Sequence, residues 1–424
     1  MRVLLADPFP EVALGELRGL GLEVDYRPGI GEAGLRDVIG EAAILVVRST
    51  AVTADVIGAA RNLGLIVRAG AGVNTIDVKS ASRRAIYVAN CPGKNSTAVA
   101  ELTMALILAL DRRVPDATKS LRAGLFDKRE YGKAKGLFGQ AIGIAGLGSI
   151  GLEVLARARA FGLVAHAWSR KLTPQKAQEL GVAFASSLEQ LATRANILTL
   201  HLPLTPATSG IVNRDVIESL PDGAMLINTA RAELVDEKAL IDLMEKKQLR
   251  VGLDVFEGEP AGSHGSASSR LLEQPGVYAT PHIGASTEQA QTAIARETVR
   301  IVRSFLVEGN VPNVVNVNVA SPARFQLVVR HLDRVGVLAN VLSVIKRHEI
   351  NVEELSNTVF DGAEAACAKI RLGSRPSGAC IEQITSFEEV LHVNLAPVPE
   401  PSNGEGGQKI SPSSVRPKRD AGVT

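Results

Sequence analysis

The chain has 424 residues, which is too long for a single hydrophobic core, so we expect two or three domains. Its formal net charge is only +2, spread along the chain, which argues against a nucleic-acid partner. Three cysteines without metal-ligand or CxxC spacing indicate a reducing compartment, and the longest apolar run, residues 102–110, is too short to cross a bilayer. We therefore expect a cytoplasmic protein that opens on a strand rather than an export leader and has no membrane partner.

The first part of the chain alternates short apolar runs with helical patterns. Residues 3–6, 44–47 and 65–67 are three of these runs. Such alternation predicts a parallel sheet with helices on its faces. The alternation restarts at residue 141, so we expect a second doubly wound unit. Ligands in such folds bind at the carboxyl ends of the strands.

The expected fold class is therefore α/β, with two doubly wound, Rossmann-like parallel-sheet domains and a C-terminal ferredoxin-like module. The last long helix of the second unit is expected to return to the first sheet. The first domain would then be discontinuous, comprising residues 1–92 and 284–314, and would flank a dinucleotide-binding domain of residues 93–283. Residues 323–396 show the order βαββαβ of a ferredoxin-like fold. Residues 397–424, rich in Pro, Ser and Gly, are predicted to be a disordered tail.

A glycine motif opens the second unit. The apolar residues 141–145 run directly into Gly-x-Gly-x-x-Gly, which is followed by a helical pattern. Gly146 allows a tight turn, Gly148 lets the backbone approach a pyrophosphate, and Gly151 allows close packing of helix on strand. The helix N-terminus would face the phosphate charge. The motif in this context predicts a dinucleotide site.

The choice of dinucleotide depends on the end of the next strand. NAD-binding folds place Asp or Glu there, about 20 residues after the first glycine, to hold the ribose hydroxyls. Here Ser169 takes that place and is followed by Arg170 and Lys171, which removes repulsion of a 2′-phosphate and could attract it. NAD and NADP are both kept as candidate cofactors, and no metal is expected.

Three further motifs follow the later strands. They are NTARAELVDE at residues 228–237, LDVFEGEP at residues 253–260 and TPHIGAST at residues 280–287. Together with GLGSIG they resemble the D-isomer-specific 2-hydroxyacid dehydrogenases, and the resemblance covers roughly residues 1–315. The ordered occurrence of four motifs makes this resemblance specific.

The resemblance implies three catalytic residues, Arg231, Glu259 and His282. When a 2-keto acid is reduced, negative charge develops on the carbonyl oxygen, so a proton donor and a fixed cation are needed. His282 would be the donor, and the base in the reverse direction. Glu259 would orient the imidazole. Arg231 would bind the substrate carboxylate and polarise the carbonyl group.

The resemblance also implies contacts to the cofactor and the substrate. The residues that it assigns to the dinucleotide are Gly146, Gly148, Ser149, Ile150, Gly151, Ser169, Arg170, His201, Pro203, Thr208, Thr229, Ala230, Asp254 and Gly284. The residues that it assigns to the substrate are Arg48, Gly72, Val73 and Asn95. Lys94 beside Asn95 would join Arg48 as a cation for a substrate phosphate.

Within the family, the chain resembles the phosphoglycerate dehydrogenases, because residues 329–339 and 350–352 resemble an ACT domain. That likeness implies oxidation of 3-phospho-D-glycerate to 3-phosphohydroxypyruvate, the opening step of serine biosynthesis. It also implies a homodimer or homotetramer. His331, Asp333 and Asn351 match positions that bind an amino-acid effector, so serine is a candidate effector; a purely structural contact between subunits is the alternative.

Two other functions remain open. A glyoxylate or hydroxypyruvate reductase, or another D-2-hydroxyacid dehydrogenase, would use the same scaffold, although those relatives usually end near residue 315. A corepressor-like binding protein that senses NADH would need no turnover. The complete set of Arg231, Glu259 and His282 argues against the second alternative.

Overall fold

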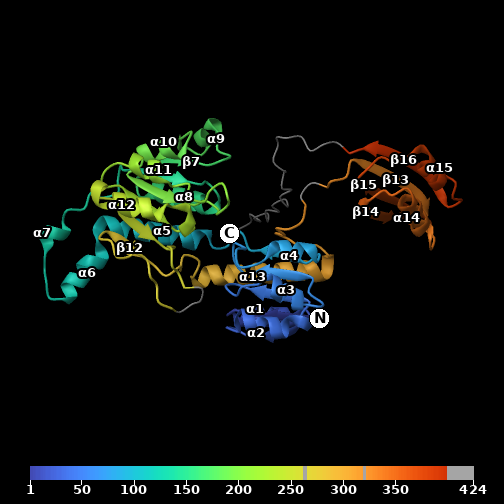
Figure 1. The fold of residues 1–424 in the computed structure, drawn as a ribbon, viewed down its shortest axis with the longest axis horizontal. Coiled ribbons are helices and arrows are strands. Elements are labelled where there is room, and N and C mark those ends of the chain that lie inside the picture. The colour runs from blue at the N-terminus through green and yellow to red at the C-terminus, as the bar shows by residue number, and fades with distance from the viewer. Residues whose placement is uncertain (261–264, 319–320, 399–424) are drawn as a thin grey trace, which may run out of the picture. The chain divides into compact units, whose positions relative to one another are not determined.

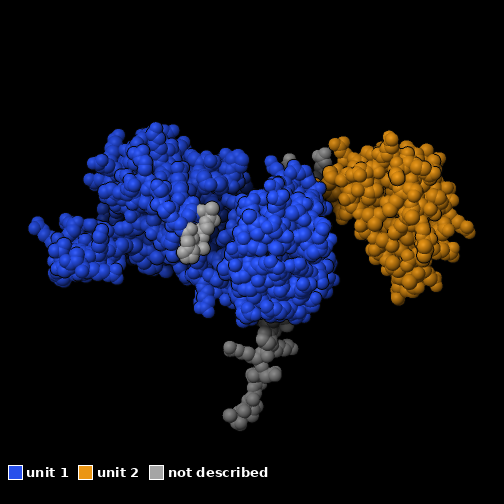
Figure 2. All heavy atoms as spheres, turned by 60° about the horizontal axis from the view of Figure 1, so that its bottom comes forward, with its two compact units in different colours: residues 1–317 blue, residues 318–424 orange. Residues whose placement is uncertain are grey.

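The computed structural model describes residues 1–260, 265–318 and 321–398. It contains two compact units, residues 1–317 and residues 318–424, drawn in different colours in Figure 2. Unit 1 holds two parallel sheets and unit 2 holds one antiparallel sheet. This arrangement confirms the predicted fold class. Among the described residues, no helix is both long and apolar enough to cross a membrane.

The first sheet has five parallel strands in the order β2-β1-β3-β4-β5. Its strands are β1 (Arg2–Leu5), β2 (Glu23–Tyr26), β3 (Ile44–Val47), β4 (Leu65–Arg68) and β5 (Tyr87–Asn90). Its helices are α1 (Glu11–Gly19), α2 (Gly31–Val38), the short 3-10 helix η1 (Ile39–Glu41), α3 (Ala54–Ala59) and α4 (Val78–Arg83). Strand β3 is entirely apolar and fully buried, as expected of a central parallel strand covered on both faces.

After the last strand of the second sheet, helix α13 (Glu288–Glu308) brings the chain back to the first sheet. Its Ile294, Val299 and Val302 share a hydrophobic core with Val3 and Leu5 of strand β1. Figure 1 shows this helix lying along the blue sheet. The chain therefore crosses twice between the two sheets, once before α5 and once before α13.

The second sheet has seven parallel strands in the order β12-β11-β10-β9-β6-β7-β8. Its strands are β6 (Ala141–Ala145), β7 (Val164–Trp168), β8 (Ala183–Phe184), β9 (Ile197–Leu200), β10 (Met225–Asn228), β11 (Arg250–Leu253) and β12 (Val277–Ala279). Its helices are α5 (Ser96–Arg112), α8 (Ser149–Ala160), α9 (Pro174–Glu179), α10 (Leu188–Thr193), α11 (Arg214–Ser219), η2 (Ala232–Leu234) and α12 (Glu237–Lys247). The strand order reverses direction at β6, which places a crevice beside the glycine motif.

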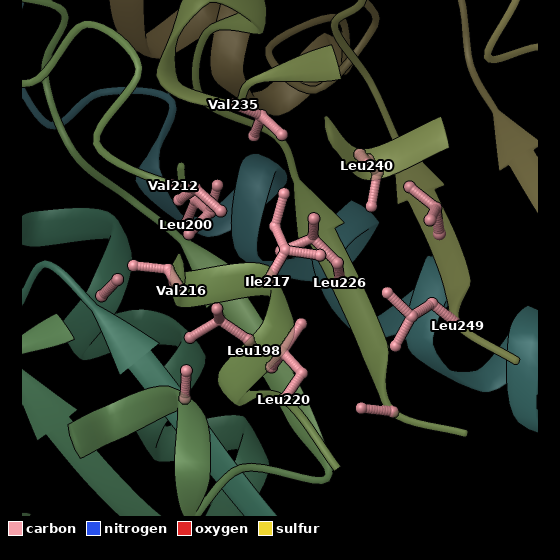
Figure 3. Packing of buried hydrophobic residues seen from close by; sticks show 14 of the residues in the cluster. Leu198, Leu200, Val212, Val216, Ile217, Leu220, Leu226, Val235, Leu240 and Leu249 are labelled. Carbon is pink, nitrogen blue, oxygen red and sulfur yellow. The ribbon is translucent and has the colours of Figure 1, made fainter. Parts of the chain in front are cut away.

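Separate hydrophobic cores cover the two faces of the second sheet. Figure 3 shows one of them, in which Leu198, Leu226 and Ile217 meet between strands β9 and β10 and helix α11. On the other face, Leu106 and Ile107 of the apolar helix α5 pack with Ile144. Helix α5 thus buries much of its apolar surface within its own unit.

An arm made of α6 (Val114–Arg122) and α7 (Lys128–Tyr131) projects from the second sheet (Figure 1). Neither helix has a buried residue. Its base is held by the hydroxyl of Tyr278, which donates to Asp116 at 2.8 Å. The arm therefore contributes little to the core of its own chain.

Unit 2 has a four-stranded antiparallel sheet in the order β14-β15-β13-β16, with both helices packed into one core. Its elements are β13 (Phe325–Leu332), α14 (Val337–Arg347), β14 (Val352–Val359), β15 (Ala365–Leu372), α15 (Gly378–Thr385) and β16 (Val390–Pro397). The element order and the strand order are those of the predicted ferredoxin-like module. The predicted disordered tail lies, from residue 399 onward, outside the described residues.

Candidate active site

A cavity of about 540 Å³ lies in unit 1 where residues that follow strands of both sheets meet. Arg68, the last residue of β4, and the loop after it form one wall; residues that follow β10, β11 and β12 form the other. The lining residues are Arg68, Gly72, Asn74, Thr75, Arg231, Ala232, Glu233, Val255, Phe256, Glu257, Gly258, Glu259 and His282. The three predicted catalytic residues therefore border one cavity.

Glu259 and His282 form a hydrogen-bonded pair in this cavity. The Nδ1 atom of His282 lies 2.8 Å from Oε2 of Glu259, while Oε1 of Glu259 accepts the amide N–H of Phe256 at 2.8 Å. Burial alone would raise the pKa of Glu259, but these two hydrogen bonds and the charge of Arg231 hold that pKa below its usual value. An ionised Glu259 fixes the ring through Nδ1 and leaves Nε2 of His282 for proton transfer.

Asp254, which directly follows β11, holds the turn that carries His282. Its carboxylate accepts hydrogen bonds from the hydroxyl of Thr280 at 2.6 Å and from the amides of Ile283 and Gly284 at 2.8 Å each. His282 itself adopts a left-handed backbone conformation, with φ of 52°. Burial raises the pKa of Asp254 even though these three donors act in the opposite direction. Both carboxylate oxygens are thus engaged within the protein.

Arg231 is positioned by a short loop after β10 that the side chain of Asn228 organises. Nδ2 of Asn228 donates to the carbonyl of Arg231 at 2.8 Å, and Oδ1 accepts the amide of Ala230 at 3.0 Å. The guanidinium of Arg231 packs against Gly72, where an added Cβ atom would lie 2.7 Å from Nη2. This contact joins the loop after β10 to the loop after β4.

Arg68 is a member of the site that the motifs do not reveal. Burial lowers the pKa of Arg68 to about 10, and the nearby positive charges of Arg231 and Arg48 add to this effect. Its Nε atom is buried and has no hydrogen-bond partner in the part of the chain that the structure describes. An arginine that ends a strand is usually a surface ion-pair residue, so the sequence alone gave no signal for it.

Arg48 is held near this cavity by Asp7. The carboxylate of Asp7 accepts the amides of Arg48 at 2.6 Å and of Ser49 and Thr50 at 3.1 Å each, which fixes the turn after β3. A terminal guanidinium nitrogen of Arg48 donates to Ser286 at 3.4 Å. Arg48 is absent from the cavity lining, yet its charge acts on Arg68.

The loop after β4 carries the predicted substrate residues Gly72 and Val73. Asn90 secures this loop through a hydrogen bond to the carbonyl of Ala71 at 2.5 Å. Within the described residues, the amide N–H groups of Gly72 and Val73 donate to no protein acceptor. Two neighbouring free amides beside Arg231 suit a carboxylate.

Asn95 and Lys94 lie outside the cavity lining. Asn95 is the N-cap residue of α5, outside the cavity lining, and its Oδ1 is buried without a partner among the described residues. The Nζ atom of Lys94 lies 3.4 Å from Glu297 of α13, so this amine is already paired. Lys94 would have to exchange this partner to serve a substrate phosphate together with Arg48, and that role stays a prediction.

The glycine loop has the geometry of a pyrophosphate cradle. A Cβ atom on Gly146 would lie 2.4 Å from the carbonyl oxygen of His201, and one on Gly151 would lie 2.0 Å from the carbonyl oxygen of Gly146. A Cβ atom on Gly148 would meet no protein atom within 4 Å. Helix α8 begins at Ser149, immediately after this open position, and Ile150 lies in its first turn. Close packing at the outer glycines and open space at the middle one fit a bound diphosphate.

Several predicted dinucleotide residues use their side chains within the protein. Thr229 pairs with Thr103 at 3.0 Å, and Thr208 donates to the carbonyl of Pro203 at 2.7 Å. His201 lies 2.9 Å from Thr199, and desolvation lowers the pKa of His201 to about 3, so its ring is neutral. These residues would reach a dinucleotide mainly through backbone atoms, as would Ala230 and Gly284.

The predicted effector residues of unit 2 do not share one environment. His331 is only 1% exposed, and its ring nitrogens contact the carbonyl of Leu332 at 2.8 Å and Asn357 at 3.3 Å. Asp333 and Asn351 are exposed. The ring of His331 is therefore part of the sheet packing.

Comparison with known proteins places unit 1 in a family. The model of the D-isomer specific 2-hydroxyacid dehydrogenase NAD binding domain matches residues 104–284. A hydroxypyruvate reductase of Thermotoga maritima is 42% identical over 268 residues, which are 62% of this chain and 85% of that protein. The chain belongs to the D-isomer-specific 2-hydroxyacid dehydrogenase family. Residues 104–284, which include the second sheet, therefore belong to the NAD-binding domain of this family, and the predicted family resemblance is confirmed.

Two further relatives carry the name of one activity. A D-3-phosphoglycerate dehydrogenase of Methanocaldococcus jannaschii is 40% identical over 322 residues, 74% of this chain and 60% of that protein. The structure of an NAD⁺-bound 3-phosphoglycerate dehydrogenase of Entamoeba histolytica has a TM-score of 0.63 and 28% identity, and it covers 75% of this chain and 99% of that one. The chain spans about three fifths of the length of the M. jannaschii relative.

Proposed function

We propose that this chain oxidises 3-phospho-D-glycerate to 3-phosphohydroxypyruvate with a nicotinamide cofactor. The observation that carries the proposal is that Arg68 and Arg231 line one cavity together with the His282–Glu259 pair, while the positive charge of Arg48 also acts on Arg68. A substrate with a carboxylate at one end and a phosphate at the other would neutralise such a set of cations. A small monoanionic acid would leave most of that charge uncompensated.

Each catalytic side chain has one task in this proposal. His282 accepts the proton of the substrate hydroxyl, and Glu259 stabilises the imidazolium that results. Arg231, with the free amides of Gly72 and Val73, binds the carboxylate next to the reacting carbon. Arg68 and Arg48 bind the phosphate. The loop from Gly146 to Gly151 would hold the nicotinamide cofactor, which would supply the hydride acceptor for the carbon that bears the substrate hydroxyl and so balance a two-electron oxidation.

We propose the same domain limits as the sequence predicts. Residues 1–92 and 284–314 would form the substrate-binding domain, and residues 93–283 the dinucleotide-binding domain. Residues 323–396 would form an ACT-like regulatory domain. The core shared by α13 and β1 supports the first assignment. A cytoplasmic location would follow from the biosynthetic role.

We also propose that the chain forms a homodimer through its arm, with a homotetramer as the alternative. Three large apolar side chains on and beside α6 are exposed to solvent: Leu121 (59%), Leu125 (63%) and Phe126 (83%). Exposed apolar side chains grouped in this way are typical of a surface that contacts another protein. Sedimentation of the wild type should give a dimer or tetramer, and Phe126→Asp should shift it toward smaller species. A wild-type monomer would contradict the proposal.

The substrate is tested by initial rates with 3-phosphoglycerate, glycerate and lactate, each with NAD and with NADP. Measurable oxidation of 3-phosphoglycerate, with much slower oxidation of glycerate, is the expected result. His282→Asn should remove most turnover and leave nucleotide binding intact. A chain that binds nucleotide but turns over none of these acids in either direction would instead support the corepressor-like alternative.

A hydroxypyruvate reductase is the second candidate, because the chain covers 85% of the length of the T. maritima protein of that name. The same experiment run in reverse, with hydroxypyruvate, glyoxylate and 3-phosphohydroxypyruvate, separates the two. Faster reduction of the unphosphorylated acids would favour the second candidate. Serine added to each assay tests whether unit 2 binds an effector, and unchanged rates at millimolar serine would argue for a structural role.

A further inference from the structure

The ends of three neighbouring strands form the part of the crevice beyond the pyrophosphate cradle. Strands β6, β7 and β8 are adjacent in the second sheet, and Ala145 of β6 pairs with Trp168 of β7. The amide of Gly146 donates to the carbonyl of Trp168 at 2.8 Å. Ser169 therefore stands directly beside the first glycine of the cradle. In this fold, the position holds the group that meets the adenosine ribose of the dinucleotide.

No carboxylate stands at the ends of these strands. The residues that follow them are 146–151, 169–173 and 185–188, and none is Asp or Glu. The nearest carboxylates in the chain, Glu153 and Glu189, lie within helices α8 and α10, and Glu153 is paired with Arg157 at 2.5 Å. A carboxylate here would bind the 2′-hydroxyl of NAD and repel the 2′-phosphate of NADP. Its replacement by Ser169 removes both effects.

Two cations occupy the same turn. The amide of Leu172 donates to the carbonyl of Ser169 at 2.9 Å, which closes a tight turn around Arg170 and Lys171. Both side chains are exposed, and neither forms an ion pair with any residue that the structure describes. Unpaired cations next to a hydroxyl donor match the chemistry of a phosphate monoester, which takes several charge-assisted hydrogen bonds.

We propose that Ser169, Arg170 and Lys171 form a 2′-phosphate site, so that this member of an NAD-binding family prefers NADP(H) to NAD(H). The inference concerns only the nucleotide, and it does not depend on which 2-hydroxy acid the chain oxidises. Its test therefore needs no substrate.

The chain carries its own reporter for this test. Trp168, its only tryptophan, ends β7 beside Ser169 and is partly buried. A bound dihydronicotinamide absorbs in the range where tryptophan emits, so titration with NADPH or NADH should quench Trp168. Calorimetry with adenosine 2′,5′-bisphosphate and with 5′-ADP gives a second readout that is independent of the nicotinamide. We expect NADPH to bind about 10- to 100-fold more tightly than NADH, with the gap narrowing as salt is added.

Variants separate the charge effect from a general loss of binding. The double variant Arg170→Ala, Lys171→Ala should weaken NADPH about 10- to 100-fold and change NADH less than about threefold. Ser169→Asp should reverse the preference by restoring the carboxylate. The matched control, Arg36→Ala with Lys246→Ala, removes two exposed cations outside this turn and should leave both affinities unchanged.

Other results would overturn the inference. NADH binding as tightly as NADPH to the wild type, or equal weakening of both nucleotides in the double variant, would show that the turn does not select the 2′-phosphate. Tight binding of NADH would contradict only this inference, because the proposed dehydrogenase activity requires one nicotinamide cofactor of either kind. Failure of both nucleotides to bind would overturn the dehydrogenase proposal together with this inference.

Discussion

The carboxylate oxygen Oδ2 of Asp254 lies 2.8 Å from the amide nitrogen of Gly284, two residues beyond His282. The same carboxylate also accepts hydrogen bonds from Thr280 and Ile283. Asp254, directly after β11, thus fixes the turn that carries His282. The turn packs tightly against Asp254, because a Cβ atom on Gly284 would lie 2.8 Å from the same carboxylate oxygen. Asp254, assigned by resemblance to the dinucleotide, thus has a clear role in positioning His282.

Asp254→Asn should therefore impair catalysis more than binding. The amide nitrogen of Asn would face the N–H groups of the turn, and misplacement of a catalytic group by about 1 Å can cost about 100-fold in rate. We expect kcat to fall on that order, while the nucleotide dissociation constant changes less than about threefold. Steady-state rates and Trp168 quenching measure the two quantities. Thr280→Val, which removes one of the three bonds, is the milder comparison.

A large change in nucleotide affinity in Asp254→Asn, with kcat preserved, would contradict this role. It would show instead that Asp254 acts by contacting the cofactor. Loss of folding is monitored by the thermal midpoint, and Thr280→Val provides the graded case if the Asn variant unfolds.

The fold could be predicted from the sequence because its signals are local. The apolar run of residues 44–47 and the glycine motif after residue 145 depend only on neighbours in the chain, and both predicted the observed elements. The motifs around Arg231, Glu259 and His282 also predicted residues that border one cavity. Their assigned roles stay predictions until they are tested.

Tertiary pairing of charges could not be predicted in the same way. Arg68 gave no signal because its burial and its proximity to Arg231 depend on two distant strands meeting. The ion pair of Lys94 with Glu297 was not foreseen either, because Glu297 lies on a helix that the chain reaches only much later. Charged residues near a strand end have many potential partners, and only the packing selects one.

The glycines of the cradle allow a matched pair of substitutions. Gly151→Ala places a methyl group 2.0 Å from the carbonyl of Gly146, which should force α8 away from β6 and cost about 1–3 kcal/mol of stability. Gly148→Ala meets no protein atom within 4 Å, so its stability should match the wild type. Its methyl group would occupy the space of the pyrophosphate and weaken dinucleotide binding by about 10-fold or more.

Thermal unfolding and Trp168 quenching together check this pair. The expected outcome is opposite behaviour, with Gly151→Ala less stable and Gly148→Ala stable but impaired in binding. Full nucleotide affinity in Gly148→Ala would refute the assignment of this loop to the diphosphate.

Arg68→Gln should discriminate between phosphorylated and unphosphorylated substrates. Loss of a charge-assisted contact to a phosphate costs about 1.5–3 kcal/mol, or roughly 10- to 150-fold in kcat/KM. We expect that loss for 3-phosphoglycerate and little change for glycerate or hydroxypyruvate, because Arg231 would still bind the carboxylate. Arg2→Gln, a variant of an arginine that pairs with Asp25 away from the cavity, is the control. Equal losses for all substrates would indicate that Arg68 only supports the loop around Gly72.

Glu297 should make stability depend on pH through its contacts with Arg300, Asn313 and Lys94. Hydrogen bonds from Arg300 lower the pKa of this carboxylate from its usual 4.5 to about 2, against the effect of burial and with help from Asn313 and Lys94. A lowered pKa in the folded state adds stability that is complete above pH 4.5 and is lost as the pH falls toward 2.

Glu297→Gln should therefore lower the free energy of unfolding by on the order of 2–3 kcal/mol at pH 7. The difference from the wild type should shrink as the pH falls from 4.5 toward 2, because the carboxylate of the unfolded wild type becomes protonated in this range while the folded form still holds its charge. Urea unfolding of unit 1 at pH 7, 4.5 and 3 measures this change. Glu308→Gln, at an exposed position on the same helix, should shift stability by less than about 0.5 kcal/mol at every pH. A difference between wild type and Glu297→Gln that stays constant down to pH 3 would show that packing, rather than ionisation of this carboxylate, is responsible for the stabilisation.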